Sequence, residues 1–540
     1  MKRFLKLLPL ALLLCLALCL LSSCEGEIEY EIAVVDGGCE IVDVLYPPFK
    51  DPVSVLTVPA EFHGLPVVSI GAEAFAYVWS LSPDTIVLPD TVKVIKDGAF
   101  EDSDVREIIL PAGLESIGAE AFFGCTKLVG IHIPKDTVIG ENAFAHCPSL
   151  AGFTVDAQNP YYTAIDGSLY TKDGSRLVFY ASKSPITSLV IPEGTEKIPD
   201  YAFRDCKTLV TIEIPEGVTE IGDFAFSGCT ALTSIRIPDS VTEIGNSAFN
   251  GCTALTSIRI PEGVTEIGYR AFTDCTALTS ITLPEGLTQI NRELFKGCTA
   301  LPCIIIPEAV TTIDEKAFAD CTALTSIRIP AGVTDIKTVF PYVGYAPRYN
   351  LFDGCTALTD IIVAEENPAY TAIDGSLYSK DGKALLLYSP ARKDSDFTVP
   401  TGVTIIESGA FYCNSTIKSI TLPEGVISIK AYAFYKCRSL RSVSLPSTLL
   451  SIEDYAFAHC ESLEAIPLPS SLLTIGEYAF FNCDALKRIV IPASVERIDF
   501  KAFRKCDGID IYAEAEKRPD GWHRKFKPIF ERVEWGYTGS

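Results

Sequence analysis

The sequence predicts a β-rich repeat solenoid, in which short coils stack on one another, with two inserted β-hairpins and a cap at each end. A unit of 23 residues recurs almost letter for letter, as in the segments that begin at Cys229 and Cys252. The phenylalanine near the end of the unit keeps this spacing through two series: Phe203, Phe226, Phe249, Phe272, Phe295 and Phe318, and then Phe411, Phe434, Phe457, Phe480 and Phe503. A repeat of about 20 to 50 residues is typical of stacked proteins, because one unit cannot bury its apolar face without neighbours.

Each unit is expected to form two short strands joined by turns. Apolar residues alternate with polar ones up to Pro261, which predicts a strand with Ile258 and Ile260 facing inward. The segment 261–263, Pro-Glu-Gly, ends that strand. A second strand is expected at 264–267, followed by a turn and about one helical turn that brings Phe272 into the core.

The chain begins with features of an export signal. Three basic residues come first, an apolar run follows, and Leu-Ser-Ser then precedes Cys24. The run is short for a membrane span, which needs about 20 residues. The segment resembles the lipobox of bacterial lipoproteins, so we expect cleavage after residue 23 and lipid attachment at Cys24. A simple secretory peptide cut nearby, or an uncleaved anchor, remains the alternative.

The cysteines do not have the spacing of a disulfide framework. Thirteen of them lie three residues after a repeat phenylalanine: Cys125, Cys147, Cys206, Cys229, Cys252, Cys275, Cys298, Cys321, Cys355, Cys437, Cys460, Cys483 and Cys506. One cysteine per coil at a fixed position predicts a column of buried free thiols, since a free cysteine packs as a small apolar side chain.

Two longer segments interrupt the repeat and match each other. Residues 159–174 and 367–382 share the pattern Thr-Ala-Ile-Asp-Gly-Ser-Leu-Tyr at an offset of 208 residues, which indicates duplication of a larger block. The Lys-Asp-Gly triplets at 172–174 and 380–382 predict tight hairpin turns. Each hairpin is expected to replace one coil.

The open ends of a solenoid need covering, because they expose apolar groups and strand edges. Alternation through 27–46 predicts a capping hairpin, and the segment after residue 509 leaves the repeat and carries Trp522 and Trp535. We expect a signal peptide at 1–23, an anchor and capping hairpin at 24–60, repeats at 61–155, a hairpin insert at 156–190, repeats at 191–363 with an aromatic loop at 337–350, a hairpin insert at 364–398, repeats at 399–508 and a C-terminal cap at 509–540.

Charge and motif content exclude several functions. A formal net charge of −24 disfavours nucleic acid, whose backbone is bound by clustered Lys and Arg. His146 and His459 precede column cysteines, but no orienting third group recurs, so no catalytic site is expected. Cys298 and Cys303 have no second pair nearby for zinc. The sequence predicts no enzyme, no metal site and no cofactor.

The unit Leu-x-x-Ile-x-Ile-Pro-x-x-Val-x-x-Ile-Gly-x-x-Ala-Phe-x-x-Cys resembles that of the BspA-like leucine-rich repeat proteins, a family of bacterial and protist surface proteins. The Asp-Gly-x-Leu-Tyr hairpins and the terminal Ile-Tyr-x-Glu-Ala with Trp522 and Trp535 also resemble this family, over about residues 27 to 535. The resemblance implies a leucine-rich repeat solenoid displayed on the cell surface, with adhesion to host matrix proteins or to other cells as the role of some members. It brings no catalytic motif.

Two binding sites are predicted from exposed positions. Arg236, Arg259 and Arg328 occupy the position between two inward-facing residues of the first strand, beside an acidic column on the second strand. They form either a charged recognition stripe or a set of mutually compensating surface charges. The second site is the inserted loop at 337–350, whose candidate contacts are Phe340, Tyr342, Tyr345, Arg348 and Tyr349. Packing of these rings on neighbouring coils is the alternative.

We therefore expect a lipoprotein on the extracellular face of a bacterial cell, held at the membrane through its lipid anchor only. Its function is expected to be adhesion to a protein of a host or neighbouring cell. Capture of an extracellular glycan for nutrient uptake is the alternative, and a purely structural role in the envelope is a third possibility.

Overall fold

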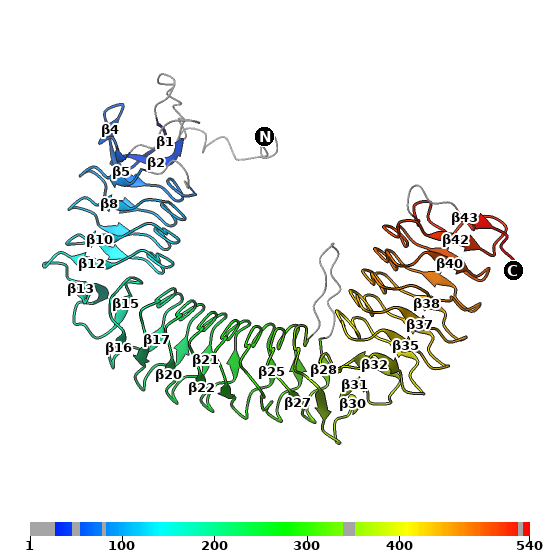
Figure 1. Cartoon of the computed structure of the whole chain (residues 1–540). Coiled ribbons are helices and arrows are strands. Elements are labelled where there is room, and N and C mark those ends of the chain that lie inside the picture. The colour runs from blue at the N-terminus through cyan, green and yellow to red at the C-terminus, as the bar shows by residue number, and fades with distance from the viewer. Residues whose placement is uncertain (1–27, 46–53, 78–82, 338–350, 528–532, 540) are drawn as a thin grey trace. The chain divides into compact units, whose positions relative to one another are not determined.

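The computed structural model describes residues 28–45, 54–77, 83–337, 351–527 and 533–539 (Figure 1). These residues belong to two compact units, Met1–Leu255 (unit 1) and Thr256–Ser540 (unit 2). Each unit is a stack of coils built from short strands and turns. The described part of the chain contains no helix, and thus none long and apolar enough to cross a membrane.

Unit 1 contains β1 to β21. Their bounds are β1 Glu29–Val35, β2 Gly38–Leu45, β3 Val55–Thr57, β4 Glu61–Phe62, β5 Leu65–Ile70, β6 Thr85–Val87, β7 Val94–Ile95, β8 Glu107–Ile109, β9 Ser116–Ile117, β10 Gly130–Ile133, β11 Val138–Ile139, β12 Gly152–Val155, β13 Tyr162–Ile165, β14 Ser168–Thr171, β15 Leu177–Phe179, β16 Ser188–Val190, β17 Lys197–Ile198, β18 Thr211–Glu213, β19 Glu220–Ile221, β20 Ser234–Arg236 and β21 Glu243–Ile244.

Unit 2 contains β22 to β43. Their bounds are β22 Ser257–Arg259, β23 Glu266–Ile267, β24 Ser280–Thr282, β25 Gln289–Ile290, β26 Thr312–Ile313, β27 Ser326–Ile329, β28 Asp335–Ile336, β29 Asp360–Val363, β30 Tyr370–Ile373, β31 Ser376–Ser379, β32 Ala384–Leu387, β33 Asp396–Thr398, β34 Ile405–Ile406, β35 Ser419–Thr421, β36 Ser428–Ile429, β37 Ser442–Ser444, β38 Ser451–Ile452, β39 Thr474–Ile475, β40 Arg488–Ile491, β41 Arg497–Ile498, β42 Asp510–Ala513 and β43 Val533–Trp535.

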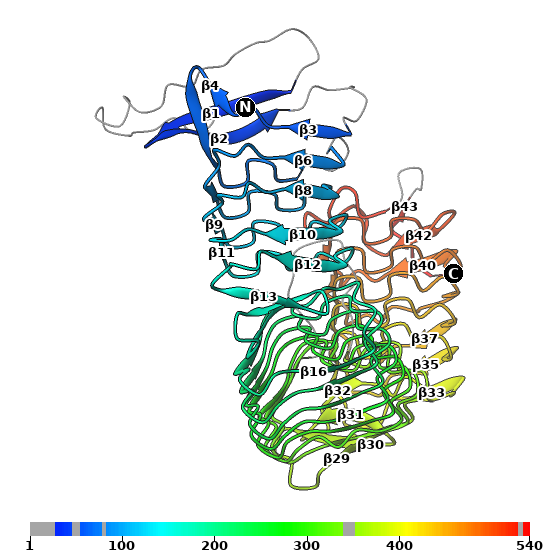
Figure 2. The ribbon, with the colours of Figure 1, turned by 90° about the vertical axis from the view of Figure 1, so that its left-hand side faces the viewer.

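Equivalent strands of successive coils pair in parallel. In unit 1 the first strands follow the order β12-β10-β8-β6-β3, and β6, β8, β10 and β12 lie side by side in Figure 2. In unit 2 the second strands continue through β32-β34-β36-β38-β39-β41. The register advances by one repeat at each step, as in the pairing of Ile406 with Ile429 and of Ile429 with Ile452. The predicted repeat solenoid is therefore confirmed.

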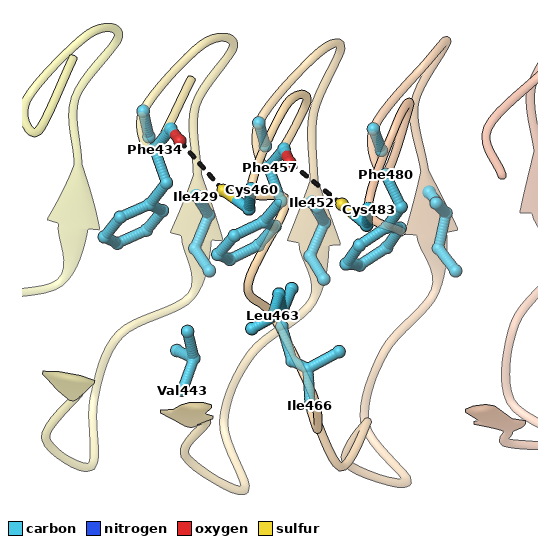
Figure 3. Close-up of a cluster of buried hydrophobic side chains, with 14 of the residues drawn as sticks. Ile429, Phe434, Val443, Ile452, Phe457, Cys460, Leu463, Ile466, Phe480 and Cys483 are labelled. Carbon is cyan, nitrogen blue, oxygen red and sulfur yellow. Dashed lines mark hydrogen bonds between the residues drawn. The ribbon is translucent and has the colours of Figure 1, made fainter. Parts of the chain in front are cut away.

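The repeat phenylalanines and cysteines form the core. In unit 2 the ring centroids of Phe434 and Phe457 lie 4.9 Å apart and those of Phe457 and Phe480 lie 5.4 Å apart, with nearly parallel planes. The Cys460 thiol donates a hydrogen bond to the carbonyl oxygen of Phe434 at 3.1 Å, and Cys483 repeats this bond to Phe457 (Figure 3). The thirteen column cysteines are all buried, as predicted.

The expected helical turn before each phenylalanine is wrong. The chain forms consecutive tight turns there, because two residues of each coil take left-handed backbone angles. In one repeat these are Arg270, with φ of 60°, and Asp274, with φ of 58°. A right-handed helix cannot continue through such residues.

Each insert folds into three antiparallel strands, and in unit 2 the third of them, β32, also pairs in parallel with β34. In unit 1, β13 pairs with β14 and β14 with β15, and in unit 2 β30, β31 and β32 do the same. The Lys-Asp-Gly turn at 172–174 is confirmed between β14 and β15. A tighter two-residue turn at Asp166-Gly167, both with positive φ, joins β13 to β14 and was missed by the sequence reasoning.

The first coil of unit 1 and the last coil of unit 2 are covered. The hairpin of β1 and β2 packs on β5 at the start. At the other end the Trp522 ring is buried and its Nε1–H donates to the Val495 carbonyl at 2.9 Å, while Trp535 lies partly buried beside it. These segments provide the capping that a stack of apolar coils requires.

Candidate functional site

The outward-facing arginines lie on exposed first strands: Arg236 at the end of β20, Arg259 at the end of β22 and Arg328 in β27. Nη2 of Arg236 lies 2.6 Å from Oε1 of Glu216, and Arg328 pairs with Glu308 in the same way. Each carboxylate belongs to the Pro-Glu turn of the preceding coil, not to the second-strand column that the sequence suggested as the partner. These pairs are largely exposed, so each contributes little to stability.

Apolar side chains share this outward position in unit 2. Ile305 is 82% exposed and Ile362 is 51% exposed, and Arg328 pairs in register with Ile362 on β29. Pro302 stands three residues before Ile305. Other coils carry a threonine at this position, and its amide donates to the preceding coil. Proline has no N–H, so the parallel ladder is interrupted here. We name Ile305, Arg328 and Ile362, with the exposed Cys303, the outward patch.

The other predicted site residues lie outside the described residues. They are Cys24 and the loop residues Phe340, Tyr342, Tyr345, Arg348 and Tyr349.

A row of tyrosines that was not predicted lies along the turns of unit 2. Tyr432, Tyr455 and Tyr478 stack with centroid distances of 4.9 Å at each step. Each of them stands two residues before a repeat phenylalanine, so the 23-residue spacing could have identified the row. Because the rings cover one another's faces, they present edges rather than flat platforms.

A buried carboxylate lies among cations on the same turns. The Glu293 side chain is 3% exposed, and Nε of Arg270 lies 2.8 Å from Oε2 of Glu293. Arg292, Lys296 and Lys316 complete the group at 3.5 to 3.9 Å. Burial alone would raise the Glu293 pKa, but the hydrogen bond from Arg270 and the surrounding positive charge hold this pKa below its ordinary value.

A cavity of about 180 Å³ lies in unit 2 beside the second hairpin insert. It is bordered by the turn after Phe352, by Tyr388 and Pro390, and by the turn from Phe411 to Ser415. The Tyr388 ring takes the place of a repeat phenylalanine, with its centroid 5.1 Å from that of Phe411.

The cavity forms because the hairpin-containing coil lacks the regular turn. Ala391 and Asp394 stand where other coils carry the core cysteine and leucine, and the amide of Ala391 and the hydroxyl of Ser389 both donate to the Leu358 carbonyl. The chain after Tyr388 is thereby drawn toward Leu358. A space is left between the turn after Phe352 and the turn from Phe411 to Ser415.

One rung of the backbone ladder is missing at this place. In regular coils the amide two residues after the phenylalanine donates to the next coil, as Asp320 does to the Asp353 carbonyl at 2.6 Å and Cys413 to Tyr435 at 2.8 Å. The corresponding residue after Tyr388 is Pro390, which has no N–H. Within the described ranges, no amide donates to the Tyr412 carbonyl oxygen.

Burial raises the pKa values of the ionisable groups of the cavity. Burial raises the pKa of the Cys413 thiol to about 11, with a smaller effect from the Asp353 charge. Burial, followed by the Asp320 charge, also raises the pKa of Asp353. Burial raises the pKa of Tyr412 as well. Such a lining suits an uncharged ligand better than an ion.

The equivalent place in unit 1 is built differently. His146, Arg204 and Asp205 stand where unit 2 has Gly354, Tyr412 and Cys413. Nε2 of His146 lies 3.9 Å from Asp205, and the guanidinium of Arg204 lies 3.8 Å from the same carboxylate. Ser182, the counterpart of Pro390, donates its hydroxyl to the Arg204 carbonyl at 3.4 Å, so the missing rung is replaced there by a side chain.

The cysteine and histidine neighbours do not form nucleophile pairs. The Cys147 thiol donates to the Phe122 carbonyl at 3.2 Å, and burial raises its pKa to about 12. Cys460 makes the equivalent bond to Phe434. A thiol so placed is a poor nucleophile, because the thiolate is the reactive form. Among the described residues, no three His, Cys, Asp or Glu side chains gather as metal ligands would.

Comparison with known proteins identifies the repeat. The family model described as BspA type leucine-rich repeat region matches with six copies, over residues 65–166, 175–302, 251–342 and 390–510. No curated protein matches the chain.

Several solved structures are similar in fold. A leucine-rich cell surface protein from Faecalibacterium prausnitzii is 26% identical, with 95% of this chain and 93% of that chain covered and a TM-score of 0.41. A leucine-rich repeat protein from Bacteroides ovatus is 22% identical over 94% of this chain and 98% of its own, with a TM-score of 0.40. Since the family model covers well over half of the sequence, the chain belongs to the BspA-type leucine-rich repeat family.

Proposed function

We propose that this protein is a surface-anchored binding protein whose role is adhesion to a protein on a host or neighbouring cell. Membership of the BspA-type family, whose proteins are bacterial surface proteins, supports the class of function. The observation that carries the proposal is the outward patch of unit 2. There, two large apolar side chains and an arginine face solvent at a position that the core does not constrain.

The composition of the outward patch favours a protein partner. Interface cores are enriched in arginine and apolar side chains and depleted of lysine and glutamate. Ile305 and Ile362 provide the apolar contacts, and Arg328 lies between them as a donor once Glu308 is displaced. A single exposed isoleucine would carry no such meaning, but these two share one strand position.

The binding test uses the chain from residue 25 on, probed against an array of extracellular matrix proteins. Replacing Ile305 and Ile362 together by serine is expected to weaken binding at least tenfold, because each apolar side chain buried at an interface contributes roughly 1.5 to 3 kcal/mol. The matched control replaces Ile109 and Val190, which occupy the same outward position in unit 1. Equal effects of both pairs would contradict the assignment to the outward patch.

The aromatic loop is a second proposed contact for the same partner. Replacing Tyr342, Tyr345 and Tyr349 together by alanine should reduce binding without lowering the melting temperature. Unchanged binding would remove the loop from the interface.

Lipid attachment at Cys24 is the proposed means of anchoring. Metabolic labelling with an alkyne fatty acid should tag the wild-type chain, and Cys24→Ala should abolish both the tag and retention in the membrane fraction. A labelled Cys24→Ala chain would contradict this anchor. No catalytic role is proposed, and turnover by the pure protein in a broad hydrolase screen would overturn that view.

Glycan capture is the second candidate function, and the cavity in unit 2 is the observation that favours it. The cavity combines aromatic rings, hydroxyl groups and an amide in a space of about 180 Å³. Saturable binding to glycans with no protein partner on the array would support this function in place of adhesion.

A further inference from the structure

The cavity in unit 2 contains two polar groups that have no partner within the part of the chain that the structure describes. One is the Tyr412 carbonyl oxygen, which lacks the amide donor that regular coils provide at this position, as Asp320 and Cys413 do. The other is the side-chain amino group of Asn414. Its Oδ1 accepts hydrogen bonds from the Thr416 and Ile417 amides, which leaves both N–H donors of Nδ2 unused.

Both groups are therefore open to a ligand. The Asn414 residue is 8% exposed and its Nδ2 is still reached by solvent, so a ligand that pairs with it replaces water. They are an acceptor and a donor, which is the combination that a secondary amide satisfies with its own N–H and C=O. The group missing from the ladder is itself a backbone amide, absent because Pro390 has none.

The remaining lining decides which amide fits. Tyr388, Phe411 and Tyr412 present apolar ring surface, and Thr356 and Ser415 contribute hydroxyls that pair with hydroxyls of a ligand. Burial raises the pKa of the Cys413 thiol and of the Tyr412 hydroxyl, so both stay uncharged near neutral pH, and the lining contains no Lys, Arg or His that would attract an anion. The volume of about 180 Å³ suits the acetamido group and one face of a ring, with the rest of the ligand in solvent.

We infer that this cavity binds an N-acetylated hexosamine residue, whose acetamido N–H donates to the Tyr412 carbonyl and whose acetamido oxygen accepts from Asn414 Nδ2. The sugar ring and the methyl group pack on the aromatic side chains. This inference rests on the second candidate function, glycan capture, for which it names the sugar class, and it is independent of the outward patch.

Two variants change the proposed contacts with little disturbance of the fold. Asn414→Asp keeps the Oδ1 acceptor for the Thr416 and Ile417 amides but removes the N–H donors. Pro390→Ser restores the hydroxyl that Ser182 provides in unit 1, so that it competes for the Tyr412 carbonyl. Ser182→Pro is the matched control, because it alters the equivalent place of unit 1 only.

Binding is measured by isothermal titration of N-acetylglucosamine and N-acetylgalactosamine into the chain from residue 25 on. Glucose and galactose serve as analogues that lack the amide. A second readout is alkylation of thiols by iodoacetamide, followed by mass spectrometry. Cys413 lines the cavity and the exposed Cys303 does not, so the two thiols give a signal and an internal control in one molecule.

The expected result is saturable binding of at least one N-acetylated sugar, at least tenfold tighter than the analogue without the amide. This sugar should slow alkylation of Cys413 but not of Cys303. Asn414→Asp and Pro390→Ser should each weaken binding at least fivefold with unchanged melting temperatures, and Ser182→Pro should not.

Three results would overturn the inference. The first is binding of N-acetylated sugars that both variants leave unchanged, which would place the sugar elsewhere while glycan capture stands. The second is equal affinity for glucose and N-acetylglucosamine. The third is protection of Cys413 by an N-acetylated dipeptide amide but by no sugar, which would make the ligand a peptide.

Discussion

Replacing the Phe457 ring by alanine is expected to open the coils of unit 2 locally. Phe457 is fully buried, with ring neighbours at 4.9 Å and 5.4 Å on either side. Loss of a buried phenylalanine ring costs about 3 to 5 kcal/mol, and each lost aromatic pair contributes to that value. In a repeat protein the loss falls on the altered coil and its neighbours, because stability is a sum of terms between adjacent coils.

Native-state hydrogen exchange with mass spectrometry measures this effect. About 4 kcal/mol corresponds to roughly a thousandfold faster exchange in segments around Phe434, Phe457 and Phe480. Peptides from unit 1 around Phe226 should keep their wild-type protection, and Phe226→Ala should give the reciprocal pattern. Equal loss of protection in both units after either substitution would contradict local opening, since it would mean that the chain opens as one cooperative structure.

Three further predictions follow from buried polar groups. Cys460→Ser should leave the urea midpoint nearly unchanged because the hydroxyl keeps the donor, whereas Cys460→Val should cost about 1 to 3 kcal/mol by leaving a buried carbonyl unpaired. Glu293→Gln should destabilise the protein at pH 7. Because the pKa of Glu293 is depressed in the folded state, the stability that this carboxylate contributes is present above the unfolded pKa of about 4.3 and is lost as the pH falls through the folded pKa. Urea titrations of the variant and the wild type should therefore converge in acid. The pKa of Cys413 is raised to about 11, so the rate of its alkylation should keep rising as the pH increases toward 11. The Asp353 charge contributes to this raised pKa, so Asp353→Asn should speed alkylation at pH 8, which kinetic labelling would detect.

The stacked core could be predicted from the sequence because one spacing determines it. Residues at the same phase of a 23-residue repeat must lie above one another once coils stack, so the burial of Phe457 and Cys460 follows from the spacing alone. The helical turn was wrong because Ala-Phe within a polar run does not reveal the left-handed angles of residues such as Arg270. Those angles are imposed by hydrogen bonds between coils.

The partners of surface charges were less predictable. Arg236 was expected to face second-strand carboxylates, but it reaches Glu216 in the turn of the preceding coil. Spacing along the chain gives no direction for a long side chain at an exposed position, where several carboxylates lie within reach.

The cavity could not be derived from the repeat because it lies where the repeat fails. Its sequence signs are Ala391 and Asp394 at the cysteine and leucine positions and Pro390 at a position where other coils donate an amide. These signs show that a turn is altered. They do not show whether neighbouring side chains fill the space. At the equivalent place of unit 1, for example, His146, Arg204 and Asp205 form a charged group instead.

The proposed role in adhesion is tested by quantitative binding of the chain from residue 25 on to arrayed extracellular proteins and glycans, with the Ile305/Ile362 and Ile109/Val190 serine variants measured in parallel. Saturable binding to a protein is expected, and it should weaken at least tenfold in the first variant and stay unchanged in the second. Absence of saturable binding to any protein, or binding that neither variant alters, would contradict the proposed role.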